Sequence, residues 1–237
     1  MDKGLVYYTD NRCEERILIA CRRQLERCME KYGFPVISVS HWPITFGKNF
    51  VMELPRSPLS IYKQMVRGME ECETDVIFLI EHDVLYHPSH FDFTPPGENR
   101  FCYNMNRWFI SSTEGKAITY YGSEDSFLSG YRELLLKHYR KAIEVTEKFG
   151  FRSSLGFNPP RGVPVEDYCG KAKRYISKYP NIHIKHDNNY TKHRMDKSEF
   201  RVERNCRNWQ EADEVPGWGK VKGRFDAFLN EVGREWT

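Results

Sequence analysis

The chain has 237 residues, of which 40% are hydrophobic and 14% aromatic. This length and composition suit one α/β domain or two small ones, and they exclude an intrinsically disordered chain. No apolar run approaches the ~20 residues that a helix needs to cross a bilayer. The start, MDKGLVYYTD, meets charge at once, so we expect neither a membrane span nor a signal peptide.

The net charge of +3 is unevenly distributed along the chain. The segment from Lys171 to Arg207 holds eleven Lys or Arg and four Asp or Glu, a balance of +7, so the remainder is acidic. A basic segment on an acidic body predicts a polyanionic partner or a phosphate-rich ligand. A solvated basic surface is the alternative, because charge alone does not distinguish the two.

The seven cysteines are odd in number and include no Cys-x-x-Cys pair. They indicate a reduced protein without a disulfide framework or a structural zinc site. Cys13, Cys21 and Cys28 are spaced so that they share a helical face with Ile17 and Leu25. We therefore expect buried thiols rather than redox chemistry.

The chain opens with a strand, a helix and a second strand. The apolar segment Leu5–Tyr8 is followed by helical spacing over Glu14–Lys31, which Gly33 ends, and by a strand over Val36–Val39. This order predicts a right-handed βαβ unit and a parallel sheet. Neither G-x-G-x-x-G nor G-x-x-x-x-G-K-[ST] occurs, which counts against dinucleotide and P-loop sites.

A second helix–strand unit follows and ends in the strand before the acidic residues. A loop over Trp42–Pro58 precedes a helix over Ile61–Cys72, which we expect Ser60 to cap, and then the strand Val76–Ile80. Five consecutive apolar residues predict a strand buried on both faces, typical of a parallel sheet. We predict an α/β fold with a largely parallel central sheet flanked by helices.

The polarity changes abruptly after this strand, to Glu81, His82 and Asp83. Ligands of open α/β sheets lie beyond the carboxyl ends of the strands, where these side chains would stand. Carboxylate oxygens suit Mg²⁺ or Mn²⁺, which commonly also bind substrate phosphates. The alternative is a solvated strand end with acids by chance.

The remaining elements follow from periodicity and turn residues. We predict strands over Arg100–Ser111 and Ile118–Tyr121, a helix over Tyr131–Phe149, a loop over Arg152–Pro164, a helix from Glu166 to Lys178, a strand over Ile182–Ile184 and an amphipathic helix within Pro216–Thr237 that packs on the body.

A buried strand ending in Glu81-His82-Asp83 resembles the acid-x-acid motif of GT-A glycosyltransferases, with Glu in place of the usual first Asp. The wider stretch EHDVLYHPSHFDF, with SVSHWPITFGKN before it and IHIKHDNNYT after it, resembles small glycosyltransferase-like proteins of phages and bacteria over most of residues 4–195. The resemblance implies one GT-A-like (Rossmann-like) domain over residues 1–237. Its donor-binding part would cover about 1–92, its acceptor and catalytic part about 93–215, and its packing helix about 216–237.

The resemblance also implies a metal site and a donor site. Asp83 would be the first ligand of Mn²⁺ or Mg²⁺, with Glu81 beside it, and His186 would take the place of the family's C-terminal metal-binding histidine. A surface histidine is the alternative at that position. The donor would be a nucleotide sugar, with a UDP-sugar such as UDP-glucose as the leading candidate. Its nucleotide would lie at Thr9, Asp10 and Asn11, and Ser40 and Asn49 are weaker donor candidates.

The catalytic base is expected at a second family motif. Val165-Glu166-Asp167 matches the x-Glu-Asp motif, whose Asp is the base in inverting members, so Asp167 is the candidate base and Glu166 its neighbour. Acids that merely oppose a helix dipole are the alternative. Glu124 and Asp125 form a reserve carboxylate pair.

The expected activity is therefore metal-dependent hexosyl transfer in the cytoplasm, or in the host cytoplasm if the gene belongs to a phage, without an obligate protein partner. Our leading acceptor is a 5-hydroxymethylpyrimidine in phage DNA, because the basic segment carries aromatic side chains that could stack on bases. A saccharide or protein acceptor is the alternative. So are a metal-dependent phosphohydrolase or nuclease that uses His87 and His90 with the acids, and a nucleic-acid-binding module without catalysis.

Overall fold

The computed structural model describes residues 1–151, 171–190 and 194–232. The helices are α1 (Glu15–Tyr32), α2 (Pro58–Glu71), α3 (Arg132–Phe149) and α4 (Phe225–Glu231). The strands are β1 (Lys3–Thr9), β2 (Val36–Ser40), β3 (Lys48–Val51), β4 (Val76–Glu81), β5 (Val84–Leu85), β6 (Arg100–Asn104), β7 (Arg107–Ser111), β8 (Ala117–Thr119), β9 (Leu128–Tyr131), β10 (Lys171–Tyr175), β11 (Asn181–Lys185), β12 (Gln210–Ala212), β13 (Glu214–Val215) and β14 (Gly219–Lys220).

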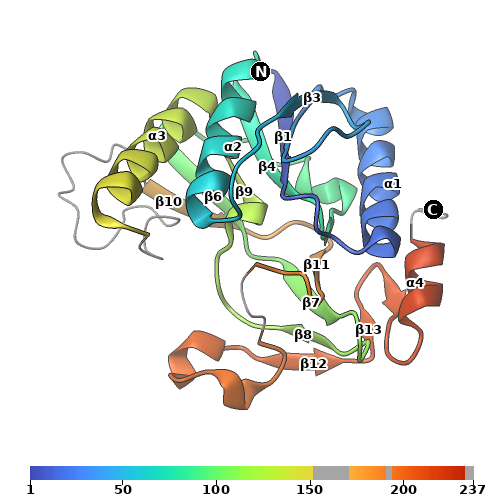
Figure 1. Cartoon of the computed structure of the whole chain (residues 1–237). Coiled ribbons are helices and arrows are strands. Elements are labelled where there is room, and N and C mark those ends of the chain that lie inside the picture. The colour runs from blue at the N-terminus through green and yellow to red at the C-terminus, as the bar shows by residue number, and fades with distance from the viewer. Residues whose placement is uncertain (152–170, 191–193, 233–237) are drawn as a thin grey trace.

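The central layer is a seven-stranded sheet in the order β10-β6-β9-β4-β1-β2-β3 (Figure 1). Every described pairing in it is parallel except those of β9, which runs antiparallel to both β4 and β6. Strand β4 lies inside this sheet, and Val76–Ile80 are fully buried. The predicted α/β class, with a largely parallel central sheet flanked by helices, is confirmed.

Alternating side chains of β1 and β4 fill two different cores. Val6 and Tyr8 of β1 pack with Ile77 and Leu79 of β4 beneath α2 and α3. The intervening side chains, such as Leu5 and Phe78, pack on the opposite face against α1. This alternation is what a strand with period two requires when helices cover both faces of the sheet. Figure 1 shows α2 and α3 together and α1 apart from them.

A second sheet, in the order β12-β8-β7-β11-β5, lies below the first in Figure 1. Its apolar side chains form a third core with Ile17 and Cys21 of α1 and with Phe225 and Phe228 of α4. The Arg23 guanidinium donates to the carbonyl oxygens of Leu229, at 2.6 Å, and of Val232, at 3.1 Å, and so fixes the end of α4. The predicted docking of the C-terminal segment on the body is seen, although α4 begins only at Phe225.

Helix α1 ends at Gly33, as predicted, with a left-handed φ of 67°. Four other expectations differ from the structure. Ser57, not Ser60, caps α2, with Pro58 in its first turn. The loop over 42–58 contains the short strand β3.

The segment 100–111 forms two strands in different sheets rather than one. The Asn104 side chain accepts a hydrogen bond from the backbone N–H of Asn106 at 3.0 Å, and this turn ends β6.

The predicted helix from Glu166 to Lys178 is wrong in its described part, because Lys171–Tyr175 pair with β6 as strand β10. Strand pairing overrides the helix-forming residues of this segment. None of the described helices has the length and apolarity that crossing a membrane requires.

The burial of β4 gives a stability prediction. Ile77 is fully buried, whereas Ile19 on the outer face of α1 is 53% exposed. Ile77→Ala should lower the free energy of unfolding by about 2–5 kcal/mol, because it removes buried methylenes and leaves a cavity. Ile19→Ala should change it by no more than about 0.5 kcal/mol. Urea denaturation followed by circular dichroism measures both, and equal losses would contradict the central position of β4.

Candidate functional site

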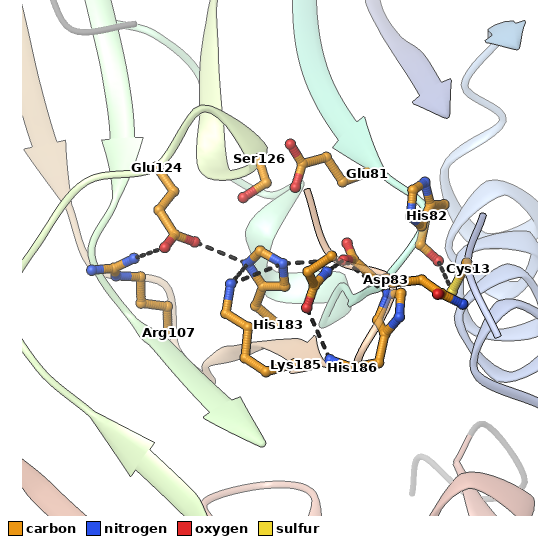
Figure 2. A network of polar contacts seen from close by, with 12 residues as sticks. Cys13, Glu81, His82, Asp83, Arg107, Glu124, Ser126, His183, Lys185 and His186 are labelled. Atoms are coloured by element: carbon orange, nitrogen blue, oxygen red, sulfur yellow. Dashed lines mark hydrogen bonds and ion pairs between the residues drawn. The ribbon is translucent and has the colours of Figure 1, made fainter. Parts of the chain in front are cut away.

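The acidic turn after β4 is tied to β11, which lies a hundred residues later in the chain. The backbone N–H of Ile184 donates to the carbonyl oxygen of Asp83 at 2.9 Å. Strand β5, directly after the turn, pairs antiparallel with β11, with His183 opposite Val84. These bonds bring the side chains of β11 to the carboxyl end of β4 (Figure 2).

Asp83 is the buried centre of the site. One of its carboxylate oxygens, Oδ2, lies 3.3 Å from His183 Nε2, 3.5 Å from His186 Nε2 and 2.6 Å from Asn189 Nδ2. The other oxygen, Oδ1, is buried and has no hydrogen-bond partner among the described residues. An unpaired buried carboxylate oxygen is costly, and a bound cation would satisfy it.

A chain of alternating charges continues from Asp83 through His183. His183 Nδ1 lies 3.0 Å from Glu124 Oε2, and Glu124 Oε1 pairs with the Arg107 guanidinium at 2.8 Å. Lys185 Nζ stands 3.1 and 3.2 Å from the two ring nitrogens of His183. Figure 2 shows this chain extending to one side of Asp83.

The histidine and its two carboxylates hold each other in charged forms. Burial and Lys185 lower the pKa of His183, but Asp83 and Glu124 outweigh them and raise it to about 9. Burial alone would raise the pKa of Asp83, yet His183 and His82 hold it well below its usual range. Burial likewise opposes ionisation of Glu124, but Arg107 and Lys185 keep its pKa low. All three groups are therefore charged at neutral pH.

Glu81 differs from these ion-paired groups. Burial, with the added charge of Asp83, raises the pKa of its carboxyl to about 7. The Tyr8 hydroxyl donates to Glu81 Oε1 at 2.7 Å, and these two residues are neighbours across β1 and β4. Two acids that share so small a volume favour a form in which one of them is protonated or both bind a cation.

The residues that could hold a metal ion form a compact group. Glu81, Asp83 and His183 each offer one ligand atom, and these atoms lie within 4.8 Å of one another. Two carboxylates and an imidazole suit Mn²⁺ or Mg²⁺. His186, which the sequence pointed to as the partner of Asp83, does face Asp83, but it belongs to a different group, with Cys13 and His82.

Two cavities adjoin this metal group. The first lies between the ends of β1 and β4 and the start of α2; its lining includes Thr9, Asp10, His41, Arg56, Gln64, Asp83 and Asn189. The second lies between α2 and the segment Ser123–Ser126; its lining includes Tyr62, Glu124, Asp125, Phe151 and Lys185. Ile61, Glu81, His183 and Tyr190 line both cavities, so the metal group stands where the two meet.

The five candidate donor residues separate into two sets. Thr9 and Asp10 line the first cavity, and Asp10 pairs with Arg56. The Asn11 side chain instead accepts from the backbone N–H groups of His41 and Trp42, so it fixes the loop after β2.

Ser40 and Asn49 hydrogen-bond to each other, with Asn49 Nδ2 donating to Ser40 Oγ at 2.9 Å. They brace β2 against β3 behind the cavity.

Sequence reasoning missed Arg56, His183 and Lys185. Arg56 pairs with Asp10, donates to the carbonyl oxygen of Asn188 and lies over the Tyr190 ring, so it links the ends of β1 and β11. Nothing in its loop sequence signals this role. His183 and Lys185 had a signal, because residues two apart on a strand share a face, and here they alternate with the buried Ile182 and Ile184.

The candidate bases Glu166 and Asp167 lie outside the described residues. The reserve pair, Glu124 and Asp125, lines the second cavity. Glu124 is committed to ion pairs, and burial, with the charge of Glu81, raises the pKa of Asp125 well above its usual range. This raised pKa favours the protonated form of Asp125, which does not suit a base.

His87 and His90 lie in the interior instead of at the metal group. The His87 ring contacts Tyr179 at a centroid distance of 4.6 Å. His90 Nδ1 bonds to the Asn104 amide at 3.0 Å, and its ring packs on Phe78 and Phe91. Neither residue belongs to the two metal-ligating groups found among the described residues.

No family model and no curated protein matches the chain. Among solved structures it is similar to a glycosyltransferase involved in the glycosylation of the major capsid of PBCV-1, with 8% identity over 74% of this chain and 82% of that one and a TM-score of 0.44. It is also similar to apo-form GlyE, a glycosyltransferase of Streptococcus pneumoniae TIGR4, with 10% identity over 73% of this chain and a TM-score of 0.44. The chain spans only 45% of GlyE. Likenesses this distant do not identify a function.

The charge chain gives a titration prediction for the metal-free protein. His183 should titrate with a pKa of about 9, above its ordinary value of 6.5. Because the folded-state pKa is the higher one, protonation of His183 stabilises the fold fully below pH 6.5, and this contribution is lost as the pH rises through about 9. Proton–nitrogen correlation NMR of the imidazole in chelator measures the pKa directly.

Glu124→Gln should lower that pKa, because it removes the charge next to Nδ1. Glu114→Gln, at an exposed turn position, is the matched control and should leave it unchanged. If the His183 imidazole of the wild-type protein titrates at or below pH 6.5, Asp83 and Glu124 do not stabilise its protonated form as proposed.

Proposed function

We propose that the chain is a metal-dependent glycosyltransferase of the GT-A type that takes a nucleotide-sugar donor, with a UDP-sugar such as UDP-glucose as the leading candidate. The observation that carries this proposal is the meeting of two cavities at Glu81 and His183, beside Asp83. A transferase must place two substrates against one reacting centre, whereas a hydrolase needs room for one substrate and water. The acid-x-acid motif at the end of β4 supports the same activity.

The first cavity suits the donor. Thr9 and Asp10 lie at the end of β1, where Asp10 can accept a hydrogen bond from a ribose or uracil. Arg56 offers a guanidinium that can contact a diphosphate. In this proposal Asn11, Ser40 and Asn49 act indirectly, by holding the loops and strands that shape the cavity.

Glu81, Asp83 and His183 would hold the divalent cation, Mn²⁺ or Mg²⁺, while His186 Nε2 faces Asp83 Oδ2 at 3.5 Å. The ion, when bound, neutralises the diphosphate leaving group. The buried Asp83 Oδ1, which has no partner among the described residues, fits this assignment. His183 must lose its proton to become a ligand, so metal binding should release a proton near neutral pH.

The transfer itself exchanges one bond for another. The acceptor hydroxyl oxygen forms a bond to the anomeric carbon, the bond from that carbon to the diphosphate oxygen breaks, and the nucleoside diphosphate leaves with the electron pair. A base takes the hydroxyl proton. We propose Asp167 for this role, with Glu166 beside it, in an inverting reaction. The states of Glu124 and Asp125 support this choice, because neither suits a base.

The second cavity favours a neutral polyhydroxyl acceptor such as a saccharide. Its lining combines the rings of Tyr62, Phe151 and Tyr190 with the acids Glu124 and Asp125. Aromatic rings pack against the apolar faces of sugars, and carboxyl oxygens accept hydroxyl hydrogen bonds. The ionised Glu124 would repel a DNA phosphate. Of the described cations between Lys171 and Arg207, Lys185 lines this cavity, and it stands against His183.

The activity prediction concerns Asp83. Asp83→Asn should lower Mn²⁺-dependent release of UDP from the UDP-sugar by at least about 100-fold, because the metal contributes several kcal/mol to transition-state stabilisation. Asp187→Asn, at the exposed position directly after His186, is the matched control. Thermal shift with UDP and Mn²⁺ identifies the donor first, since a ligand at ~100 times its Kd adds about 2.7 kcal/mol of stability.

Two results would refute the assignments. Full activity of Asp83→Asn in chelator would remove Asp83 from the metal site. Full transfer by Asp167→Asn, with donor binding unchanged, would remove Asp167 as the base. Degradation of DNA without any nucleotide sugar would instead indicate the nuclease alternative.

The acceptor prediction compares saccharides with modified DNA under the same conditions. We expect a hexose-sized mass increase on a saccharide acceptor and none on nucleosides from DNA that contains 5-hydroxymethylcytosine or 5-hydroxymethyluracil. Mass spectrometry after digestion measures both. An increase on the modified nucleosides that Asp83→Asn abolishes would overturn the saccharide assignment and support transfer to DNA.

A further inference from the structure

A second cluster of metal-ligating side chains lies beside Asp83. Cys13 precedes α1, His82 lies between Glu81 at the end of β4 and Asp83, and His186 follows β11. Each offers one ligand atom, and these atoms lie within 4.8 Å of one another. Figure 2 shows Cys13 and His82 on the other side of Asp83 from His183 and Glu124. The two metal-ligating groups therefore share no residue.

Within the part of the chain that the structure describes, three of the four ring nitrogens in this cluster are buried and unsatisfied. His82 Nδ1 and both ring nitrogens of His186 are buried without a hydrogen-bond partner among the described residues. The 3.5 Å between His186 Nε2 and Asp83 Oδ2 is long for a hydrogen bond. Buried polar atoms almost always have partners, so three unsatisfied nitrogens in one place indicate an absent ligand.

The donor set differs in chemistry from that of Glu81, Asp83 and His183. A thiolate and two imidazoles prefer a borderline-soft ion such as Zn²⁺, whereas carboxylates prefer Mg²⁺ or Mn²⁺. Zn²⁺ binds sulfur at about 2.3 Å and nitrogen at about 2.0–2.1 Å, so the ligand atoms of a tetrahedral site lie about 3.4–3.7 Å apart. From separations of at most 4.8 Å, the ligand atoms need to approach one another by no more than about 1.4 Å.

We propose that Cys13, His82 and His186 form a second metal site for a borderline-soft divalent cation of the Zn²⁺ type. The ion joins the segment before α1 to the ends of β4 and β11, which are the elements that carry the acidic turn and its histidines. One ring nitrogen of His186 then binds the metal while Nε2 faces Asp83, an arrangement common to metal-binding histidines. The site is independent of sugar transfer and stands whether or not the proposed function is correct.

Cobalt tests this site, because Co²⁺ bound to a thiolate gives a near-ultraviolet charge-transfer band that carboxylate and imidazole ligands do not give. The full-length protein is stripped with chelator and titrated with CoCl₂. We expect the thiolate band to appear, to saturate at one equivalent and to disappear when ZnCl₂ is added. It should be absent in Cys13→Ser and retained in Cys206→Ser, the control at a buried cysteine outside the cluster. It should also persist in Glu81→Gln, which alters only the carboxylate group.

A second variant guards against loss of the band through misfolding. His82→Gln keeps the thiol but removes one nitrogen ligand, so the Co²⁺ affinity read from the same band should fall at least about tenfold, the lower end of the cost of losing even an outer-shell partner. Circular dichroism verifies that both variants are folded. Absence of a thiolate band in the wild-type protein, its survival in Cys13→Ser, or an unchanged affinity in His82→Gln would overturn the proposal.

Discussion

A buried carboxylate, that of Asp83, sets the conditions for the rest of the site. A charge in the interior is tolerated only when ion pairs and hydrogen bonds replace water, and losing one partner of a buried pair typically costs about 3–5 kcal/mol. Among the described residues, the Asp83 carboxylate faces His183, His186 and Asn189, all on or just after β11. The turn after β4 therefore requires a strand that arrives a hundred residues later. This requirement couples the two sheets, because β4 belongs to one and β11 to the other.

The charges around this carboxylate alternate in sign. Arg107, Glu124, His183 and Asp83 follow one another at 2.8, 3.0 and 3.3 Å, so each charge is offset by the next. A divalent cation at Glu81 and Asp83 would replace the positive charge of His183 by a larger one. Such a site exchanges a proton for a metal ion, and its affinity depends on pH. The same network fixes the position of the imidazole before any ligand arrives.

The features that depend on local sequence pattern were predictable, namely the central strand and the acids that follow its apolar run. The apolar run Val76–Ile80 was recognisable as a central strand because five consecutive apolar residues fit no exposed element. Glu81 and Asp83 were recognisable as candidate ligands because they come directly after this apolar run.

The parts that depend on distant pairing were not predictable. Residues Lys171–Tyr175 have a helix-forming sequence, yet they pair with β6. Likewise Cys13 was grouped with Cys21 and Cys28 by spacing, but α1 begins only at Glu15, which leaves Cys13 free to face His82.

Part of the basic segment forms an edge strand of the seven-stranded sheet, and this position suggests a second role for its charge. Within the described residues β10 and β3 are its outermost strands, and β10 exposes Lys171, Lys173 and Arg174 while β3 exposes Lys48. Outer strands present unpaired backbone groups to which another chain can add, and charged side chains at such positions discourage that pairing. Part of the positive charge that suggested a polyanionic partner therefore protects against self-association. Neutralising these lysines should favour aggregation even if no ligand is lost.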